Sequence, residues 1–337
     1  MKVGLSPPAL PAAGLIPLLG LLCVVVHLIG NQLVEGALTE ALVYMVMVVG
    51  LSVFVSNSGI ISFGHVSFAL IGAYASAWQT CCPGLRGVFM PGLPKIVLDT
   101  NVPVIPAALI AALLAAAVAA VAGVAIARLD AVAASIALLS LLFVVKTIYE
   151  NWTSITAGQG SLAGLPLYVS LWTALAWAAV AIVVAQFYMI SAHGLRLRAT
   201  REDYAAARAA GILPWRERLI ALVISGFLFA IGGILFGHYL GTLAVSIYWL
   251  DMTFLTLAML VVGGMRSLTG AVVGTLAIST VRELLRALER GFDFGATTIQ
   301  IPQGTQEVAL SLALLLVLIF RPQGIVGDYE LGVSLPR

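Results

Sequence analysis

Apolar residues run along this chain in long blocks that are separated by shorter polar connections. Ten blocks with few charged residues lie near positions 12–30, 37–55, 65–81, 103–127, 131–149, 168–190, 219–243, 248–264, 268–288 and 305–320. A helix needs about 20 apolar residues to cross the hydrocarbon core of a bilayer, so these blocks predict membrane-spanning helices, several of them short for a full crossing. The pattern therefore predicts an all-α integral membrane protein. We expect a polytopic helical bundle of about 8–10 transmembrane helices, with short or broken helices, forming one transmembrane domain over residues 1–337.

Composition supports a membrane protein. The chain is 61% hydrophobic and 9% charged, whereas soluble domains carry roughly 25% charged residues. The surplus apolar surface has to face lipid. The net charge of +2 gives no reason to expect nucleic-acid binding. No A-x-A cleavage site follows the first apolar block, so this block is expected to be a transmembrane helix and not a secretory signal.

The distribution of Lys and Arg predicts the orientation of the helices. The most charged stretch is HGLRLRATREDYAAARAAGILPWRER, residues 193–218, which contains six Arg. Because Lys and Arg gather in cytoplasmic connections, this stretch is expected to be a cytoplasmic loop. With ten spans, both termini are then cytoplasmic, and the long connections 82–102 and 150–167 face the periplasm.

Residues 201–210 within this loop are expected to form one short helix. Thr200 is a suitable N-cap, and Asp203 falls at the third helical position, as in a variant capping box. Gly211 is placed to end the helix in the left-handed conformation. A helix of about ten residues is marginal by itself in water, so it needs support. It is either a solvated loop helix whose arginines set the topology or a surface that docks on a partner.

A second irregular stretch, SNSGIISFGH at residues 56–65, interrupts two apolar blocks. Broken backbone at membrane depth is tolerated only where protein or a cavity surrounds it, and it recurs in the binding and gating regions of transporters. The candidate pathway or broken-helix residues are Asn57, Gly59, Ser62, Gly64 and His65. His65 either lines a pathway or makes a hydrogen bond that braces the break.

Glycines at four-residue spacing predict close helix packing, within the chain or toward a partner. They are Gly233, Gly237, Gly241, Gly270 and Gly274. His238 and Asp251 are expected at a solvated membrane end. Lys146 and Glu150 are four residues apart on one helix face and form either an ion pair or part of a vestibule. Small apolar packing is expected of the three cysteines, without a disulfide framework: Cys23, Cys81 and Cys82.

Four regions carry a family resemblance. They are GIISFGHVSFALIGAY (59–74), TREDYAAARAAGI (200–212) with VISGFLFAIGGILFGHYLG (223–241), VVGGMRSLTGAVVGT (261–275) and IFRPQGIVG (319–327). Together they resemble the permease subunits of bacterial ABC importers of the branched-chain amino acid (LIV) type, in particular the LivM-like half. The chain departs from that family's pattern at Ile60, where Gln is usual, at Arg266, where Gly is usual, and at Ala271, where Pro is usual.

The resemblance implies a permease that forms a translocation pathway for amino acids, branched-chain ones first, by alternating access. Its implied partners are a homologous LivH-like permease, two cytoplasmic ABC ATPase subunits, a periplasmic substrate-binding protein and membrane lipid, with no cofactor, catalytic residue or metal site. Its implied location is the bacterial inner membrane. Residues 193–218 would be the coupling loop, and the ATPase-coupling residues would be Thr200, Arg201, Glu202, Asp203, Tyr204, Ala207, Arg208 and Gly211. Similar permeases carry urea or short amides, so the same role for those cargoes is the alternative.

ATP hydrolysis is not expected in this chain. A phosphate-binding loop needs G-x-x-x-x-G-K-[ST], and none of Lys2, Lys95 and Lys146 follows such a pattern. Energy must then come from a partner or from an ion gradient. An ion-coupled secondary transporter, with His65 and Glu150 as proton relays, is the less favoured alternative. An intramembrane enzyme would need a convergent nucleophile, base or metal constellation, which four scattered histidines do not supply.

Overall fold

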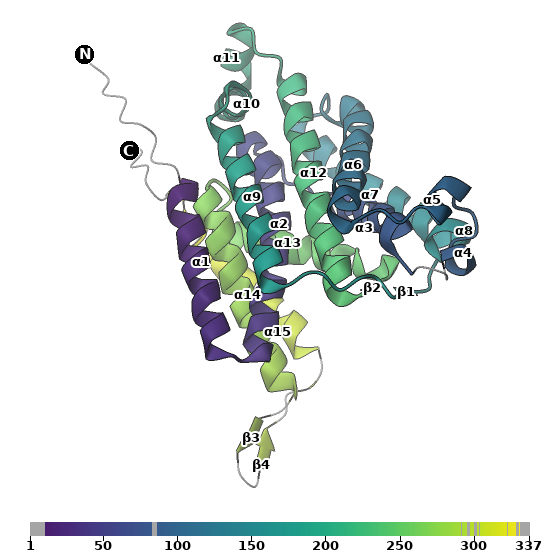
Figure 1. Cartoon of the computed structure of the whole chain (residues 1–337). Helices are drawn as coiled ribbons and strands as arrows, with labels where there is room; N and C mark the ends of the chain where they lie inside the picture. The colour runs from purple at the N-terminus through teal and green to yellow at the C-terminus, as the bar shows by residue number, and fades with distance from the viewer. Residues whose placement is uncertain are drawn as a thin grey trace.

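The computed structural model describes residues 11–82, 86–290, 292–294, 297–299, 302, 304–321, 323–327 and 330 (Figure 1). The helices are α1 (Pro11–Ile29), α2 (Gln32–Ser58), α3 (Val66–Thr80), α4 (Arg86–Phe89), α5 (Lys95–Asp99), α6 (Val104–Ile126), α7 (Ala131–Asn151), α8 (Thr153–Thr156), α9 (Leu171–Ile190), α10 (Ala192–Glu202), α11 (Tyr204–Ala209), α12 (Pro214–Leu240), η1 (Val245–Ile247), α13 (Leu250–Gly263), α14 (Leu268–Arg290) and α15 (Thr305–Phe320). Two short antiparallel pairs join β1 (Leu162–Ala163) to β2 (Thr242–Leu243) and β3 (Phe292–Phe294) to β4 (Thr297–Ile299). The two termini, for which a cytoplasmic location is predicted, lie outside the described residues.

The protein is a multi-pass helical membrane protein, as the apolar blocks predict. Within the described residues, 8 helical segments are long and apolar enough to cross a membrane. The predicted spans 65–81 and 305–320 correspond to α3 and α15, which have 15 and 16 residues and are shorter than a full crossing requires. The predicted bundle of about 8–10 helices with short members is therefore confirmed.

The connections between helices gather at two opposite ends of the bundle. Figure 1 places α10 and α11 at the top and the β3–β4 pair at the bottom. At the upper end, Arg218 donates to the carbonyl of Leu129 in the α6–α7 connection at 2.8 Å. The connections on either side of α6 and α7 also meet, since the Gly92 N–H donates to the Ser154 carbonyl at 2.9 Å. These contacts place the α6–α7 connection at one end of the bundle and the connections before α6 and after α7 together.

Helix α2 forms the centre of the bundle. Its most apolar window is 94% buried, and it packs against α9, α12 and α14. Asn31 starts this helix by accepting a hydrogen bond from the Leu33 N–H at 3.0 Å, and Gly59 ends it in the left-handed conformation (φ 73°). Close approach to α12 requires glycine, because a Cβ at Gly50 would lie 2.9 Å from the Cβ of Leu228.

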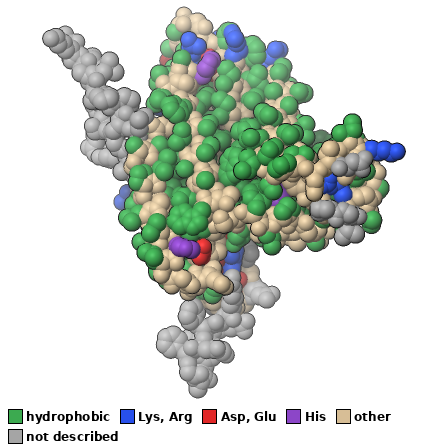
Figure 2. Space-filling view, viewed as in Figure 1, with side chains coloured by type: hydrophobic (Ala, Val, Ile, Leu, Met, Phe, Trp, Pro, Cys, Tyr) green, Lys and Arg blue, Asp and Glu red, His purple; other side chains and the backbone are tan. Residues whose placement is uncertain are grey.

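Apolar side chains cover much of the outer surface. Figure 2 shows a broad band of hydrophobic side chains across the bundle, with Lys and Arg gathered at the upper end and at one side. Exposed members include Leu113, Val132 and Phe187, which are 61%, 73% and 65% exposed. A water-facing surface of this kind is unfavourable, and a lipid-facing one is expected of membrane helices.

Candidate functional site

The charged segment 193–218 folds mainly as α10, α11 and the start of α12. Between α10 and α11 the chain is extended at Asp203 (φ −148°), and the Asp203 side chain caps α11 by accepting from the Ala206 N–H at 2.9 Å. The prediction of one helix over 201–210, starting at Thr200, is therefore wrong. An Asp side chain competes with the helical ladder for backbone N–H groups, so Asp203 begins a new helix instead of sitting in the first turn of one.

Thr200 is an interior residue of α10. It is 5% exposed, and its hydroxyl donates to the carbonyl of Leu197 at 2.6 Å. Gly211, in contrast, ends α11 as its position predicts. Its φ of +81° lies in the left-handed region, and the Ile212 N–H donates back to the carbonyl of Ala207 at 3.1 Å, which closes the last turn.

The outer face of α11 presents an aromatic ring between two cations. Tyr204 is 48% exposed, and its ring centre lies 6.0 Å from the guanidinium carbon of Arg208 and 5.8 Å from that of Arg218. Glu202 beside it is also exposed. Ala207 is 5% exposed, so it contacts this chain's own helices and not the outer face. The segment therefore offers Tyr204, Arg208 and Glu202 to any partner at this end of the bundle.

Arg201 joins the charged segment to the interruption after α2. Its guanidinium donates to the carbonyl of Ser56 in the last turn of α2. A Cβ added at Gly59 would lie 2.9 Å from the Cγ of Arg201, so the arginine stem lies directly against the C-cap of α2. Its side chain is 16% exposed. The charged segment 193–218 and the interruption at residues 56–65, which lie far apart in sequence, are thus in direct contact.

Most of the interruption between α2 and α3 is buried by protein, although Gly59 and Ile61 near its start are exposed. Asn57 and Ser62 are each 1% exposed, and the Asn57 amide donates to the carbonyl of Val53 at 2.9 Å. At Gly64 the backbone of α7 comes so close that an added Cβ would lie 1.9 Å from the carbonyl oxygen of Leu138. Surrounding helices therefore supply the protein enclosure that broken backbone needs in a membrane.

His65 braces this interruption through hydrogen bonds on both ring nitrogens. Nε2 lies 2.7 Å from the Ser225 hydroxyl, which donates its own proton to the carbonyl of Gly50 at 2.7 Å. Nε2 must then donate, so Nδ1 accepts from the Ser62 hydroxyl at 2.5 Å. The neutral imidazole is fully paired at 2% exposure, which matches the bracing interpretation of His65. The pathway role of the five interruption residues stays a prediction.

All five spaced glycines lie close to other parts of the chain, four of them inside helices. A Cβ at Gly233 would lie 2.6 Å from Ala69 of α3, while one at Gly237 would lie 3.2 Å from the Tyr248 hydroxyl. On α14, a Cβ at Gly270 would meet the Gly264 carbonyl at 2.7 Å, and one at Gly274 would meet the Met259 carbonyl at 2.0 Å. The fifth glycine, Gly241, instead ends α12 in the left-handed conformation (φ 68°). A Cβ at Gly241 would lie 2.8 Å from Cδ2 of Leu167 in the connection that leads to α9, so this glycine also makes a close contact, and its place in a packing seam stays a prediction.

Comparison with known proteins identifies the family. The family model for the branched-chain amino acid transport system permease component matches residues 33–320. The chain belongs to this permease family. It is 26% identical over 322 residues to LivM, the high-affinity branched-chain amino acid transport system permease protein of Escherichia coli K12, covering 86% of this chain and 68% of LivM. It is 24% identical over 323 residues to LivH of Salmonella typhimurium LT2, covering 89% of this chain and 96% of LivH. No solved structure matches.

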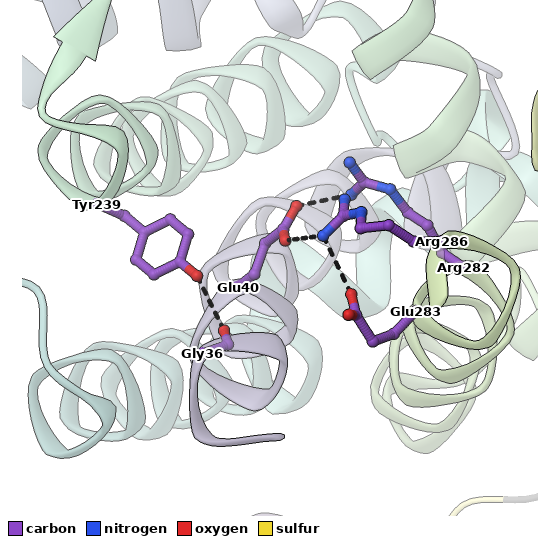
Figure 3. Close-up of polar contacts among 6 residues, drawn as sticks. All are labelled: Gly36, Glu40, Tyr239, Arg282, Glu283 and Arg286. Atoms are coloured by element: carbon purple, nitrogen blue, oxygen red, sulfur yellow. Dashed lines mark hydrogen bonds and ion pairs between the residues drawn. The ribbon is translucent and has the colours of Figure 1, made fainter. Parts of the chain in front are cut away.

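At the lower end of the permease, an ion network ties α14 to α2 (Figure 3). Glu40 of α2 accepts from Arg282 at 2.8 Å and from Arg286 at 3.1 Å, and Arg286 also reaches Glu283 at 3.0 Å. Tyr239 of α12 donates to the carbonyl of Gly36 beside it at 3.0 Å. Residue spacing does not predict this network, because Glu40 is more than 200 residues from its partners, although the charged face of α14 is a signal for it. The network holds the lower ends of α2, α12 and α14 together.

Two further polar predictions have opposite outcomes. Lys146 and Glu150 form the predicted ion pair, with Nζ and Oε1 2.7 Å apart. His238 is not solvated: it is fully buried, its Nδ1 donates to the carbonyl of Pro166 at 3.0 Å, and its Nε2 lies 3.0 Å from the Ser76 hydroxyl. The connection between β1 and α9 folds over this histidine and removes it from solvent, which local sequence does not reveal. Asp251 is exposed.

The cysteines also differ from expectation. Cys81 and Cys82, predicted to be simple packing residues, are joined by a disulfide between neighbouring residues. Cys23 is free and buried, as predicted. Across the described part of the permease, no group of three or more His, Cys, Asp or Glu side chains is arranged to hold a metal ion.

Proposed function

We propose that this permease is the membrane-spanning subunit of an ATP-driven importer, and that it forms one half of a translocation pathway that works by alternating access. A homologous LivH-like permease supplies the other half. Two cytoplasmic ABC ATPase subunits drive the cycle, and a periplasmic binding protein delivers the cargo. The chain itself carries no phosphate-binding loop, so the energy of ATP enters through contact with the ATPases.

The observation that carries this proposal is the contact of Arg201 with the end of α2. The exposed face of α11 is positioned to receive a partner, and Arg201 connects the adjoining end of α10 to the interruption between α2 and α3. A displacement of α11 by an ATPase would therefore reach the central helix through the adjoining α10, whose Arg201 contacts the end of α2. Rigid helices joined by such contacts convert a local movement into a change between two packed states.

The charged segment supports a cytoplasmic location for this end of the bundle. It holds six of the 14 arginines, more than any other connection, and retention of Lys and Arg in the cytoplasm governs the orientation of membrane helices. Both termini then face the cytoplasm, and the bacterial inner membrane is the location that fits the relatives. The connection containing the Cys81–Cys82 disulfide then faces the periplasm, where disulfides persist.

The cargo proposed first is a branched-chain amino acid, because this chain is similar to LivM and LivH proteins over most of its length. The same role for urea or short amides is the alternative. Proteoliposomes containing the complete complex and the binding protein test both, with ATP supplied on the side of the ATPases. Uptake is measured for amino acids, urea and amides in parallel. ATP-dependent uptake supports the proposal, and equal uptake by vesicles that lack the ATPases overturns it in favour of an ion-coupled transporter.

The docking surface has its own test. Replacing Tyr204 and Arg208 together with alanine should release the ATPases from the purified complex, because both side chains lie on the exposed face of α11. Arg216→Ala is the matched control, since this exposed arginine lies at the same end but outside α11. Normal retention of the ATPases and normal uptake by the double variant would contradict docking at this surface.

A further inference from the structure

An ion pair flanked by two aromatic side chains lies at the end of α7 that is remote from α10 and α11. Lys146 Nζ lies 2.7 Å from Glu150 Oε1 and 4.3 Å from the centre of the Trp249 ring. The Trp249 ring meets Phe143 edge to face at a centroid distance of 4.7 Å. The cluster thus combines one cation, one anion and two large aromatic surfaces within two turns of α7 and the residue before α13.

This cluster opens to the outside of the chain. The side chains of Lys146 and Glu150 are 20% and 23% exposed, and Phe143 is 46% exposed. Lys146 and Glu150 lie in the last turns of α7, and ionisable side chains near the end of a membrane helix reach toward water because lipid solvates charge poorly. The open side of the cluster is therefore accessible to water, and its assignment to the pathway between the two permease halves is part of the inference.

The turn that carries the charges is held in place from behind. Tyr149, between Lys146 and Glu150 in sequence, is buried, and its ring packs against Tyr74 of α3 at a centroid distance of 5.3 Å. The hydroxyl of Thr156 donates to the Tyr149 carbonyl. Both charges are thus presented by a fixed turn, which reduces the ordering cost of binding a ligand there.

We infer that Lys146 and Glu150 bind the carboxylate and the ammonium group of a zwitterionic α-amino acid, whose apolar side chain contacts Trp249 and Phe143. This inference rests on the proposed transport function and names the residues that select its cargo. Binding of a zwitterion replaces the Lys146–Glu150 pair with two ion pairs, one between Lys146 and the carboxylate and one between Glu150 and the ammonium group. It adds no net charge to the site. Urea and neutral amides carry no charges with which to replace the Lys146–Glu150 pair, so the site disfavours them.

The decisive experiment is a fluorescence titration of Trp249 in the purified complex without binding protein. Three ligands of similar shape serve as probes: leucine, leucinamide, which lacks the carboxylate, and 4-methylpentanoate, which lacks the ammonium group. Leucine is expected to quench Trp249 saturably, and Trp249→Phe identifies that signal. Lys146→Gln should weaken binding of leucine and 4-methylpentanoate by about tenfold or more but spare leucinamide, because it removes only the charged partner of the carboxylate.

Glu150→Gln should give the opposite selectivity, weakening leucine and leucinamide and sparing 4-methylpentanoate. Lys95→Gln is the matched control, an exposed lysine in the connection at the same side. A pair with a purely structural role would weaken all three ligands equally or none, and either pattern overturns the inference. If a single variant fails to assemble, the reversed pair Lys146→Glu with Glu150→Lys is tested. Restored leucine uptake there indicates a structural ion pair, whereas assembly without uptake supports the site.

Failure of the inference and failure of the proposed function are distinguishable. A wild-type complex that shows no ATP-driven uptake of any cargo contradicts the proposed function. Normal wild-type uptake together with unchanged leucine uptake and binding in both single variants contradicts only the assignment of Lys146 and Glu150.

Discussion

Replacing Arg201 with methionine should separate ATP hydrolysis from transport. Methionine keeps an unbranched apolar stem against Gly59 but removes the guanidinium that donates to the Ser56 carbonyl. The arginine side chain is only 16% exposed, so water replaces the lost donor poorly. A hydrogen bond with a charged partner contributes about 1.5–3 kcal/mol. If this contact transmits the movement of α11 to α2, losing it should lower transport per ATP by about tenfold or more, since each 1.4 kcal/mol is a factor of ten.

The assay measures cargo molecules imported per ATP hydrolysed in proteoliposomes of the complete complex. Arg201→Met should keep the ATPases bound and hydrolysing while this ratio falls. Arg216→Met removes an exposed cation at the same end and should leave the ratio unchanged. An unchanged ratio in Arg201→Met, in a complex that assembles normally, would refute the idea that this side chain carries the coupling.

Three further outcomes follow from the packing and the charges. Gly274→Ala should lower the unfolding temperature and the yield of the permease, because its Cβ would lie 2.0 Å from a carbonyl oxygen of α13 and overpacking costs about 1–3 kcal/mol. Gly14→Ala is the control, because nothing lies within 4 Å of a Cβ there. Equal unfolding temperatures for the two variants would contradict the close approach of α13 and α14. Glu40→Gln should destabilise the lower end by about 1.5–3 kcal/mol, because two arginines of α14 lose the anion that accepts their hydrogen bonds. Hydrogen exchange in α14 that stays as slow as in the wild type would argue against that role. Burial raises the pKa of Glu330, and the hydrogen bonds from the residues that begin α14 act in the opposite direction. The folded chain therefore keeps this proton to higher pH than the unfolded chain, so the stability linked to it is complete below pH 4.5 and is lost as pH rises through the raised pKa. Glu330→Gln should flatten the dependence of the unfolding temperature on pH above 4.5, and an unchanged slope would contradict it.

Local pattern was sufficient for the helical architecture. The apolar blocks predicted the positions of the spans, because the thickness of the bilayer sets the length of an apolar helix that crosses it. They also marked α3 and α15 as short. Gly211 was identified as a helix end from its position alone and adopts the left-handed conformation. The same reasoning failed at Thr200, which continues α10 instead of capping a helix, because the next helix begins three residues later at Asp203.

Contacts between distant parts of the chain were decided only by the tertiary structure. Arg201 and Ser56 are 145 residues apart, and Arg282 and Glu40 are 242 residues apart, so no periodicity or spacing connects them. Burial of His238 depends likewise on a connection that begins far from it in sequence. The sequence by itself determined which segments enter the membrane, because hydrophobicity and helix length are properties of each segment. Which side chains from different segments come into contact depends on how the helices pack. The proposed coupling contact of Arg201 with Ser56 and the proposed amino-acid site of Lys146, Glu150, Trp249 and Phe143 both depend on such contacts.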